Sequence, residues 1–201
     1  MAKIAIDVVL LPSEKMMDTA IKINQVLLKE NENKIILDKK YCLPHISLCM
    51  GCIDEVKIPE IKKILDEIAT DFSVFKLQAT ALEAEIIPSG RKVSTLHIKN
   101  QDELQKLHET VMKKLWEYLS YDVKISMLFN PPEVEEATLY WIKNYGKHYD
   151  NPSLFSPHIT VGFGETDRFK MPIDFDASTI ALCQLGNYNT CRKVIVSSEL
   201  N

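Results

Sequence analysis

The sequence has no apolar run that approaches the roughly 20 residues needed to cross a lipid bilayer. Its first twelve residues hold one lysine and then Asp7 within an apolar stretch, which is unlike a secretory signal peptide.

There is no excess of positive charge either, because the sequence has 24 Lys and Arg and 28 Asp and Glu, a formal net charge of −4. Proteins that hold long nucleic acid nonspecifically need a basic surface, so that class is disfavoured, whereas a small anion can be held locally. We therefore expect a soluble, cytoplasmic protein.

Arginine and cysteine are scarce. Bidentate phosphate clamps are few, because arginine occurs only at Arg91, Arg168 and Arg192. The five cysteines are an odd number in a chain that looks cytosolic, which favours reduced thiols over a disulfide framework. A domain of 201 residues buries roughly 70% of the surface of its unfolded chain, so no cross-link is needed for a core. No linker or low-complexity segment divides the chain, and 1–201 is expected to form one domain.

Apolar periodicity alternates between two and about 3.6 residues, a pattern typical of strands interleaved with helices. Pro59 lies at the favoured first turn of one predicted helix, and Gly146 ends another. The segment 147–157 is predicted to be a loop, and the turn 88–91 a hairpin. Strands are predicted at 4–11, 45–50, 75–87, 92–98, 158–163, 180–185 and 194–198, and helices at 13–29, 59–70, 102–119 and 133–145.

One octapeptide occurs twice. The sequence PHISLCMG at 44–51 recurs 113 residues later as PHITVGFG at 157–164, with four identical and three conservative positions. Two strands of the same local chemistry, one in each half of the chain, predict two similar lobes that share a cleft. We expect a pseudo-twofold axis to relate these lobes.

Each copy places one histidine and one hydroxyl on the same side of its strand. Side chains two positions apart on a strand point to the same face, so His45 projects with Ser47 and His158 with Thr160. The aliphatic residues between and after them face the opposite way, toward the core of each lobe. The shared cleft would therefore hold two imidazoles and two hydroxyls.

This set suits the opening of a phosphodiester. Imidazole has an unperturbed pKa of about 6.5, so one histidine can act as a base while the other acts as an acid at the same pH. The hydroxyls can donate hydrogen bonds to the two nonbridging oxygens, whose charge must be stabilised in the transition state. This chemistry requires no metal ion.

The paired motifs resemble the two-histidine (2H) phosphoesterase superfamily, most closely its branch of bacterial 2'-5' RNA ligase-like proteins and 2',3'-cyclic phosphodiesterases. Leu10-Leu11-Pro12 before a helix, the run 75–88, and the strand 91–98 follow the order of elements in that family. The resemblance implies an α+β fold of two pseudo-twofold-related lobes, each an antiparallel sheet flanked by helices, with a cleft between them. It implies His45 and His158 as catalytic residues, Ser47 and Thr160 as phosphate-binding residues, and neither a cofactor nor a metal.

Residues near the motifs are candidates for further substrate contacts. An aromatic ring can stack on a nucleobase, although aromatic residues that flank strands more often serve packing. Arg168 is the first arginine after the second motif and could contact a phosphate. The aromatic candidates are Tyr41, Phe155 and Phe163.

Two further interpretations concern the cysteines and the remaining histidines. Cys42, His45, Cys49 and Cys52 form a C-x₂-H-x₃-C-x₂-C run that superficially resembles a zinc site. Strand alternation opposes it, because Cys52 has the opposite parity to His45, and the second copy has glycine in place of Cys49. The remaining histidines are interpreted as structural or surface residues, least securely His97, whose strand can neighbour the cleft; the set is His97, His108 and His148.

The sequence thus predicts a metal-independent phosphoesterase that hydrolyses 2',3'-cyclic phosphate ends of RNA or small cyclic nucleotides by His/His acid-base catalysis. Activity as a 2'-5' RNA ligase or a 2'-5' phosphodiesterase is a further option within this class. The alternative is a noncatalytic module that binds nucleotides or RNA ends in the same cleft. We expect a monomer with no membrane partner.

Overall fold

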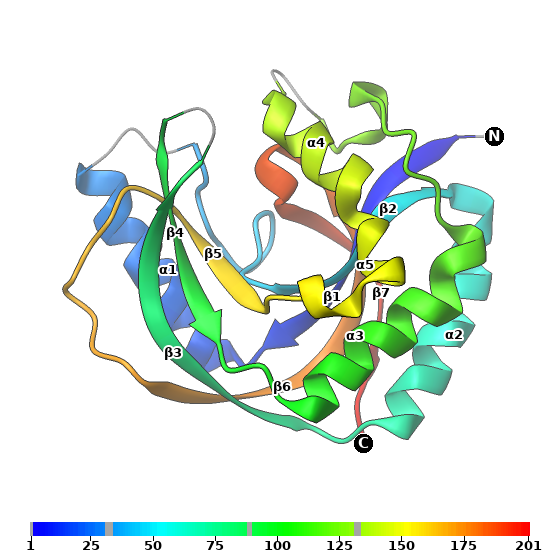
Figure 1. The fold of residues 1–201 in the computed structure, drawn as a ribbon, viewed down its shortest axis with the longest axis horizontal. Coiled ribbons are helices and arrows are strands. Elements are labelled where there is room, and N and C mark those ends of the chain that lie inside the picture. The colour runs from blue at the N-terminus through cyan, green and yellow to red at the C-terminus, as the bar shows by residue number, and fades with distance from the viewer. Residues whose placement is uncertain (1, 31–33, 88–89, 131–133) are drawn as a thin grey trace.

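A computed structural model describes residues 2–30, 34–87, 90–130 and 134–201 (Figure 1). Its fold is α+β with a seven-stranded antiparallel sheet, which confirms the predicted class. Among these residues, no helix combines the length and the apolar character that crossing a membrane requires. The strands are β1 (Lys3–Pro12), β2 (Ile46–Asp54), β3 (Phe75–Ile86), β4 (Lys92–Ile98), β5 (His158–Phe163), β6 (Ile173–Leu185) and β7 (Cys191–Glu199). The α-helices are α1 (Glu14–Glu30), α2 (Ile58–Asp71), α3 (Asp102–Leu115), α4 (Glu136–Tyr145) and α5 (Lys147–Asp150).

Strand β6 joins two groups of strands into one sheet of order β2-β1-β6-β3-β4-β5. Its first part, 173–177, pairs with β3, and its second part, 179–185, pairs with β7. Strand β1 pairs along the other edge of β6. We call the group β2, β1, β7 and the end of β6 the first lobe, and the group β3, β4, β5 and the start of β6 the second lobe.

The two terminal strands of the sheet meet. Strands β2 and β5 stand at opposite ends of the strand order, yet they contact each other. The sheet therefore curves so strongly that its ends come together near the middle of the molecule (Figure 1). These two strands carry the repeated octapeptide.

Helices are exchanged between the lobes. Helix α1 follows β1 of the first lobe but packs against β5 of the second, whereas α3 follows β4 of the second lobe but packs against β2 of the first. Figure 1 shows α1 on one side of the molecule and α2 with α3 on the other. This reciprocal packing is what two lobes related by a pseudo-twofold axis would show, and the axis itself stays a prediction.

A buried asparagine fixes α1 to the second lobe. The side-chain amide of Asn24 donates hydrogen bonds of 2.8 Å to the carbonyls of Val161 in β5 and of Ile35. Its Oδ1 accepts a hydrogen bond of 3.0 Å from the backbone N–H of Leu37. Because each polar atom of the buried amide has a partner, Asn24 specifies the position of β5 without a desolvation penalty.

Helix faces follow the apolar spacing of the sequence. The buried residues of α3 share one face, as their spacing predicts; they are Leu104, Leu107, Val111 and Leu115.

Most of the predicted elements are confirmed, with boundaries that differ by a few residues. Strand β6, however, begins at Ile173, seven residues before its predicted start.

The predicted loop at 147–157 is wrong in part. It contains α5 and a 3₁₀ turn at Pro152–Leu154. Gly146 has φ −54°, a right-handed helical conformation that separates α4 from α5 without a left-handed cap. The predicted first residue of the helix that contains α4, 133, and two residues of the predicted hairpin, 88–89, lie outside the described residues.

The expectation that all thiols are reduced is also wrong. Cys183 in β6 and Cys191 in β7 form a disulfide, with their Cα atoms 5.6 Å apart. The hairpin between β6 and β7 brings these residues together, and their separation of eight positions gave no sign of this. Cys42, Cys49 and Cys52 are free and buried.

Candidate active site

His45 lies directly before β2 at the meeting point of the two lobes. Its Nδ1–H donates a hydrogen bond of 2.7 Å to the carbonyl of Leu43, which leaves Nε2 as the nitrogen that can accept or transfer a proton. The side chain is 14% exposed, so the ring is largely shielded but reachable. Ser47, two positions further on, is half-buried, as the strand alternation predicts.

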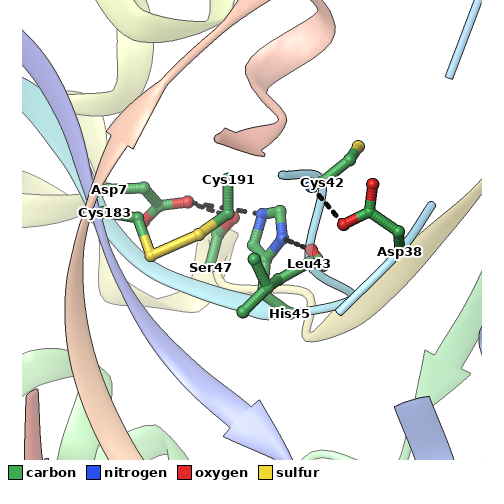
Figure 2. The surroundings of a disulfide bond; sticks show 8 residues. All are labelled: Asp7, Asp38, Cys42, Leu43, His45, Ser47, Cys183 and Cys191. Atoms are coloured by element: carbon green, nitrogen blue, oxygen red, sulfur yellow. Dashed lines mark hydrogen bonds and ion pairs between the residues drawn. A yellow bond between two sulfur atoms is a disulfide. The ribbon is translucent and has the colours of Figure 1, made fainter. Parts of the chain in front are cut away.

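A buried carboxyl group lies beneath this pair. Asp7 in β1 is fully buried, and its Oδ2 is joined to Ser47 Oγ by a hydrogen bond of 2.6 Å. The same Oδ2 is 3.8 Å from His45 Nε2. Figure 2 shows Asp7 and Ser47 on one side of the His45 ring and the carbonyl of Leu43 on the other. We call Asp7, His45 and Ser47 the first half-site.

Sequence reasoning missed the role of Asp7. The only signal was a charged residue inside the apolar run that forms β1. A carboxyl group is almost never fully buried unless it has a partner or a function, so this position was the anomaly in the strand. The sequence alone does not show which motif Asp7 approaches. This depends on how β1 pairs with β2, where a bulge between Val8 and Val9 shifts the register.

His158 occupies the corresponding place in the second lobe. Its Nδ1–H donates a hydrogen bond of 2.8 Å to the carbonyl of Ser156, so Nε2 is again the reactive nitrogen. The side chain is exposed, whereas Thr160 is half-buried. On the neighbouring strand β4, His97 stands opposite His158, and Thr95 opposite Thr160. We call His97, His158 and Thr160 the second half-site.

His97 therefore belongs to the site and is not a remote surface residue. Its Nε2 lies 3.2 Å from Thr95 Oγ1 and 3.4 Å from an oxygen of Glu83 on β3. Glu83 is opposite Thr95 in the β3–β4 pairing, so these side chains share the face of the sheet that carries His158. Of the three histidines interpreted as structural, His97 was the least secure, and it is the one that stands opposite His158.

The motif histidine of the second lobe is close enough to His45 to affect its titration. Burial, together with a smaller contribution from the charge of His158, lowers the pKa of His45 to about 4. Desolvation by neighbouring atoms lowers the pKa of His158 as well, even though part of its surface is exposed. The charge of His97 adds to this decrease, while Glu85 opposes it. His45 is therefore neutral at pH 7.

Burial changes the pKa of Asp7 in the opposite sense. Desolvation raises it to about 8, against the lowering effects of the hydrogen bond with Ser47 and of the backbone N–H groups of Cys49 and Leu48. Oδ1 of Asp7 has no hydrogen-bond partner among the described residues. The site thus contains a carboxyl group that favours its neutral form at pH 7.

The four candidate substrate contacts differ in position. Tyr41 is 53% exposed, with the Lys40 ammonium 4.9 Å from its ring centroid. Phe155 is buried and stacks on His108 at 4.2 Å. The ring of Phe163 is also buried.

Neither Phe163 nor Arg168 is placed to contact a substrate on the face of the sheet that carries the motif histidines. The guanidinium of Arg91 lies 3.6 Å from the centroid of the Phe163 ring and covers it. Arg168 lines a cavity of about 550 Å³ together with Ser94 of β4. Ser94 has the opposite parity to Thr95, so this cavity is on the other face of the sheet from His158.

The structure brings no metal-binding cluster together in its described part. No group of three or more His, Cys, Asp or Glu side chains there is placed to hold a metal ion, which disfavours the zinc interpretation of the run from Cys42 to Cys52. The His45 ring instead faces Asp7 and Ser47. The arrangement offers two imidazole nitrogens for proton transfer and two hydroxyls for hydrogen bonding.

The fold and these half-sites define an α+β protein with one histidine motif on each of two touching strands. Solved structures share this fold over the full length of the chain. TT0787 of Thermus thermophilus is 15% identical over 98% of both chains, with a TM-score of 0.62.

LigT of E. coli in its apo form is 12% identical over 100% of this chain and 99% of its own, with a TM-score of 0.58. LigT complexed with 3'-AMP has a TM-score of 0.52 at the same identity and coverage. No family model matches the sequence, and no curated protein does. The chain thus has the fold of LigT, in agreement with the resemblance of its motifs to the 2H phosphoesterases.

Proposed function

We propose that this protein is a metal-independent 2H phosphoesterase that opens 2',3'-cyclic phosphates at RNA ends or in small nucleotides. The observation that supports this most is the contact between β2 and β5, which joins two His-x-Ser/Thr half-sites and brings the charge of His158 close enough to lower the pKa of His45. The shared fold with LigT agrees with it, and the complex of LigT with 3'-AMP supports a nucleotide as ligand.

The depressed pKa of His45 makes this residue the general base. At pH 7 its Nε2 is unprotonated and can take a proton from a water molecule, whose oxygen then attacks phosphorus. The pKa of His158 is lowered too, chiefly by desolvation, so its Nε2 carries a proton in only part of the molecules at pH 7, and this protonated form is the acid. Its Nε2–H gives a proton to the leaving ribose oxygen as the P–O bond breaks. The product is a phosphomonoester with one free ribose hydroxyl.

The two hydroxyls stabilise the charge that develops on phosphorus. Ser47 and Thr160 each donate a hydrogen bond to one nonbridging oxygen of the pentacoordinate transition state. Neither step requires a metal ion. If a ribose 5'-hydroxyl takes the place of water, the same steps form a 2'-5' linkage as the 3'-oxygen leaves, and in the reverse direction, in which the 3'-hydroxyl attacks and the 5'-oxygen leaves, the two histidines exchange roles.

Two histidine variants test this function. His45→Ala and His158→Ala should each reduce turnover of a 2',3'-cyclic nucleotide by roughly 10²- to 10⁴-fold, because each removes a proton-transfer group. His148→Gln is the control for the loss of an imidazole that lies outside the motif strands, since this histidine is in α5 and stacks on Tyr145. Turnover is followed by phosphorus NMR in the presence of a strong chelator, and melting temperatures verify folding.

The same experiment separates the proposal from its alternatives. Loss of all turnover on addition of the chelator, or full activity of the two alanine variants, would contradict it. Binding of cyclic nucleotides without any product would instead indicate a noncatalytic module. A monomeric state, a cytoplasmic location and the single bilobal domain remain predictions.

A further inference from the structure

The hydrogen bond between Asp7 and Ser47 raises the question of which oxygen holds the proton. A serine hydroxyl has one hydrogen, and an ionised carboxylate can only accept. If Asp7 is ionised, Ser47 must give its hydrogen to Asp7 and cannot give it to a phosphate. If Asp7 is neutral, its own O–H can donate to Ser47 Oγ across the 2.6 Å contact, and the Ser47 hydrogen is free to point elsewhere.

The surroundings of Asp7 favour the neutral form. The carboxyl group is fully buried, and among the described residues His45 is the one basic side chain within ion-pair distance of it. His45 is itself neutral at pH 7. Burial of a carboxylate without a cationic partner costs several kcal/mol, and for Asp7 this desolvation outweighs the hydrogen bonds with Ser47 and with the backbone N–H groups of Cys49 and Leu48, so the group takes up a proton.

Asp7 faces titratable or sulfur-containing groups from three neighbouring elements. From β2, these are His45 and the Cys49 thiol, and burial keeps this thiol protonated by raising its pKa. From α4, Tyr145 interacts with Asp7 and has a raised pKa, chiefly through burial. From β6, the residue opposite Asp7 is Cys183, whose sulfur is held in the disulfide (Figure 2). None of these groups supplies a positive charge at neutral pH.

We propose that Asp7 is a positioning residue that, as a neutral acid, donates a hydrogen bond to Ser47 Oγ and thereby directs the Ser47 hydrogen toward the phosphoryl oxygen of the substrate. This assignment deepens the proposed function and rests on it. The geometry that supports it is the short contact, the complete burial of Asp7 and the half-buried position of Ser47.

The second half-site has a different arrangement. Thr95 is opposite Thr160, and the carboxylates that β3 places on that face are exposed: Glu83 is paired with His97, and the charge of Glu85 acts on His158. The Thr160 hydroxyl thus has no buried acid beside it among the described residues. Control by a neutral acid is therefore specific to the first half-site, which provides a matched control within the same molecule.

The proposal predicts a loss of phosphate affinity in the alkaline range. Because the pKa of Asp7 is raised to about 8, its neutral form is present below this pH and is lost above it. Ionisation withdraws the Ser47 hydrogen and places a negative charge next to the bound phosphate. If the ionised form does not bind, KM for a 2',3'-cyclic nucleotide rises roughly tenfold between pH 7 and pH 9, in which range the substrate keeps one negative charge.

Asp7→Asn is the decisive variant. Its amide N–H donates to Ser47 Oγ at every pH, so KM should stay within about threefold of the wild-type value at pH 7 and should no longer rise toward pH 9. Ser47→Ala should raise KM at pH 7 and weaken its pH dependence. Thr160→Val should raise KM but retain the alkaline rise, because Asp7 remains beside Ser47.

Two further measurements keep the test independent of turnover. Calorimetric binding of 3'-AMP from pH 7 to pH 9.5 should show the same rise in Kd in the wild type and its absence in Asp7→Asn, whether or not the protein hydrolyses anything. Infrared spectra at pH 7 should contain the C=O stretch of a protonated carboxylic acid that disappears in Asp7→Asn. If this variant does not fold, Ser47→Ala and the wild-type spectrum serve the same purpose.

The outcomes separate the two proposals. A rise in Kd that Asp7→Asn abolishes, without any turnover, supports the role of Asp7 and contradicts the phosphoesterase function. An alkaline rise that persists in Asp7→Asn, a flat profile in the wild type, or no binding of 3'-AMP at any pH overturns the role of Asp7.

Discussion

The two half-sites have nearly the same sequence and different environments. His45 is 14% exposed and has a fully buried acid beside it, whereas His158 is exposed and stands opposite another histidine. The difference does not come from the octapeptide itself. It comes from the neighbouring strand, which is β1 with Asp7 in the first lobe and β4 with His97 in the second.

In the proposed mechanism, this difference divides the chemistry between the lobes. The shielded histidine is neutral at pH 7 and can act as a base, and the open one can exchange protons with solvent and act as an acid. A near-symmetric pair of motifs thus acquires distinct roles from its asymmetric surroundings. Variants that affect the two half-sites unequally test this difference.

The largest effect is expected when the leaving group is changed. A nitrophenyl phosphodiester needs no acid, because its leaving group departs as an anion. With this substrate, His158→Asn should retain activity within about tenfold of the wild type, while His45→Asn should lose roughly 10²-fold or more. With a 2',3'-cyclic nucleotide both variants should lose at least that much. Equal losses on both substrates would contradict the division of roles.

A smaller effect concerns stability, and Asp7→Asn isolates it. The pKa of Asp7 is about 8 in the folded protein and about 3.9 in an unfolded chain, so a rise in pH between these values favours the unfolded state. The asparagine variant avoids this and should be more stable at pH 8, on the order of 1–3 kcal/mol. The difference should vanish below pH 4. Urea unfolding at several pH values measures it, and a less stable variant at pH 8 would refute the buried neutral acid.

The smallest effect is expected at His97. The charge of this residue lowers the pKa of His158, so His97→Gln should raise that pKa and shift the alkaline limb of the kcat/KM profile to higher pH. The acidic limb, which reflects the pKa of His45 near 4, should not move. Glu85→Gln should shift the alkaline limb the opposite way. Identical profiles for all three proteins would show that the second half-site is insensitive to its neighbours.

Much of this site could be predicted from the sequence, because a strand alternates its side chains with a fixed period. Repeating octapeptides placed His45 with Ser47 and His158 with Thr160 without knowledge of any tertiary contact. The helices followed from apolar spacing in the same local way. These features depend on residues only a few positions apart.

The remaining features depend on strand register, which local patterns do not reveal. Asp7 meets Ser47, forty positions away, and His97 meets His158 only because β4 pairs with β5 in one particular alignment. The disulfide between Cys183 and Cys191 likewise follows from a hairpin with two register shifts. Bulges of this kind move a strand by one residue and invert its faces, so a sequence pattern alone cannot fix them.

The exchange of helices has a consequence for how the molecule can be divided. The chain segment of the first lobe is split, since β1 and β2 precede the second lobe and β7 follows it, while α1 and α3 each cover the other lobe's sheet. If the chain is cleaved at one position between the lobes, each of the two fragments therefore lacks part of the hydrophobic core of both lobes. Such fragments should regain activity only when they are mixed, so neither half of this chain is an autonomous folding unit in its present form.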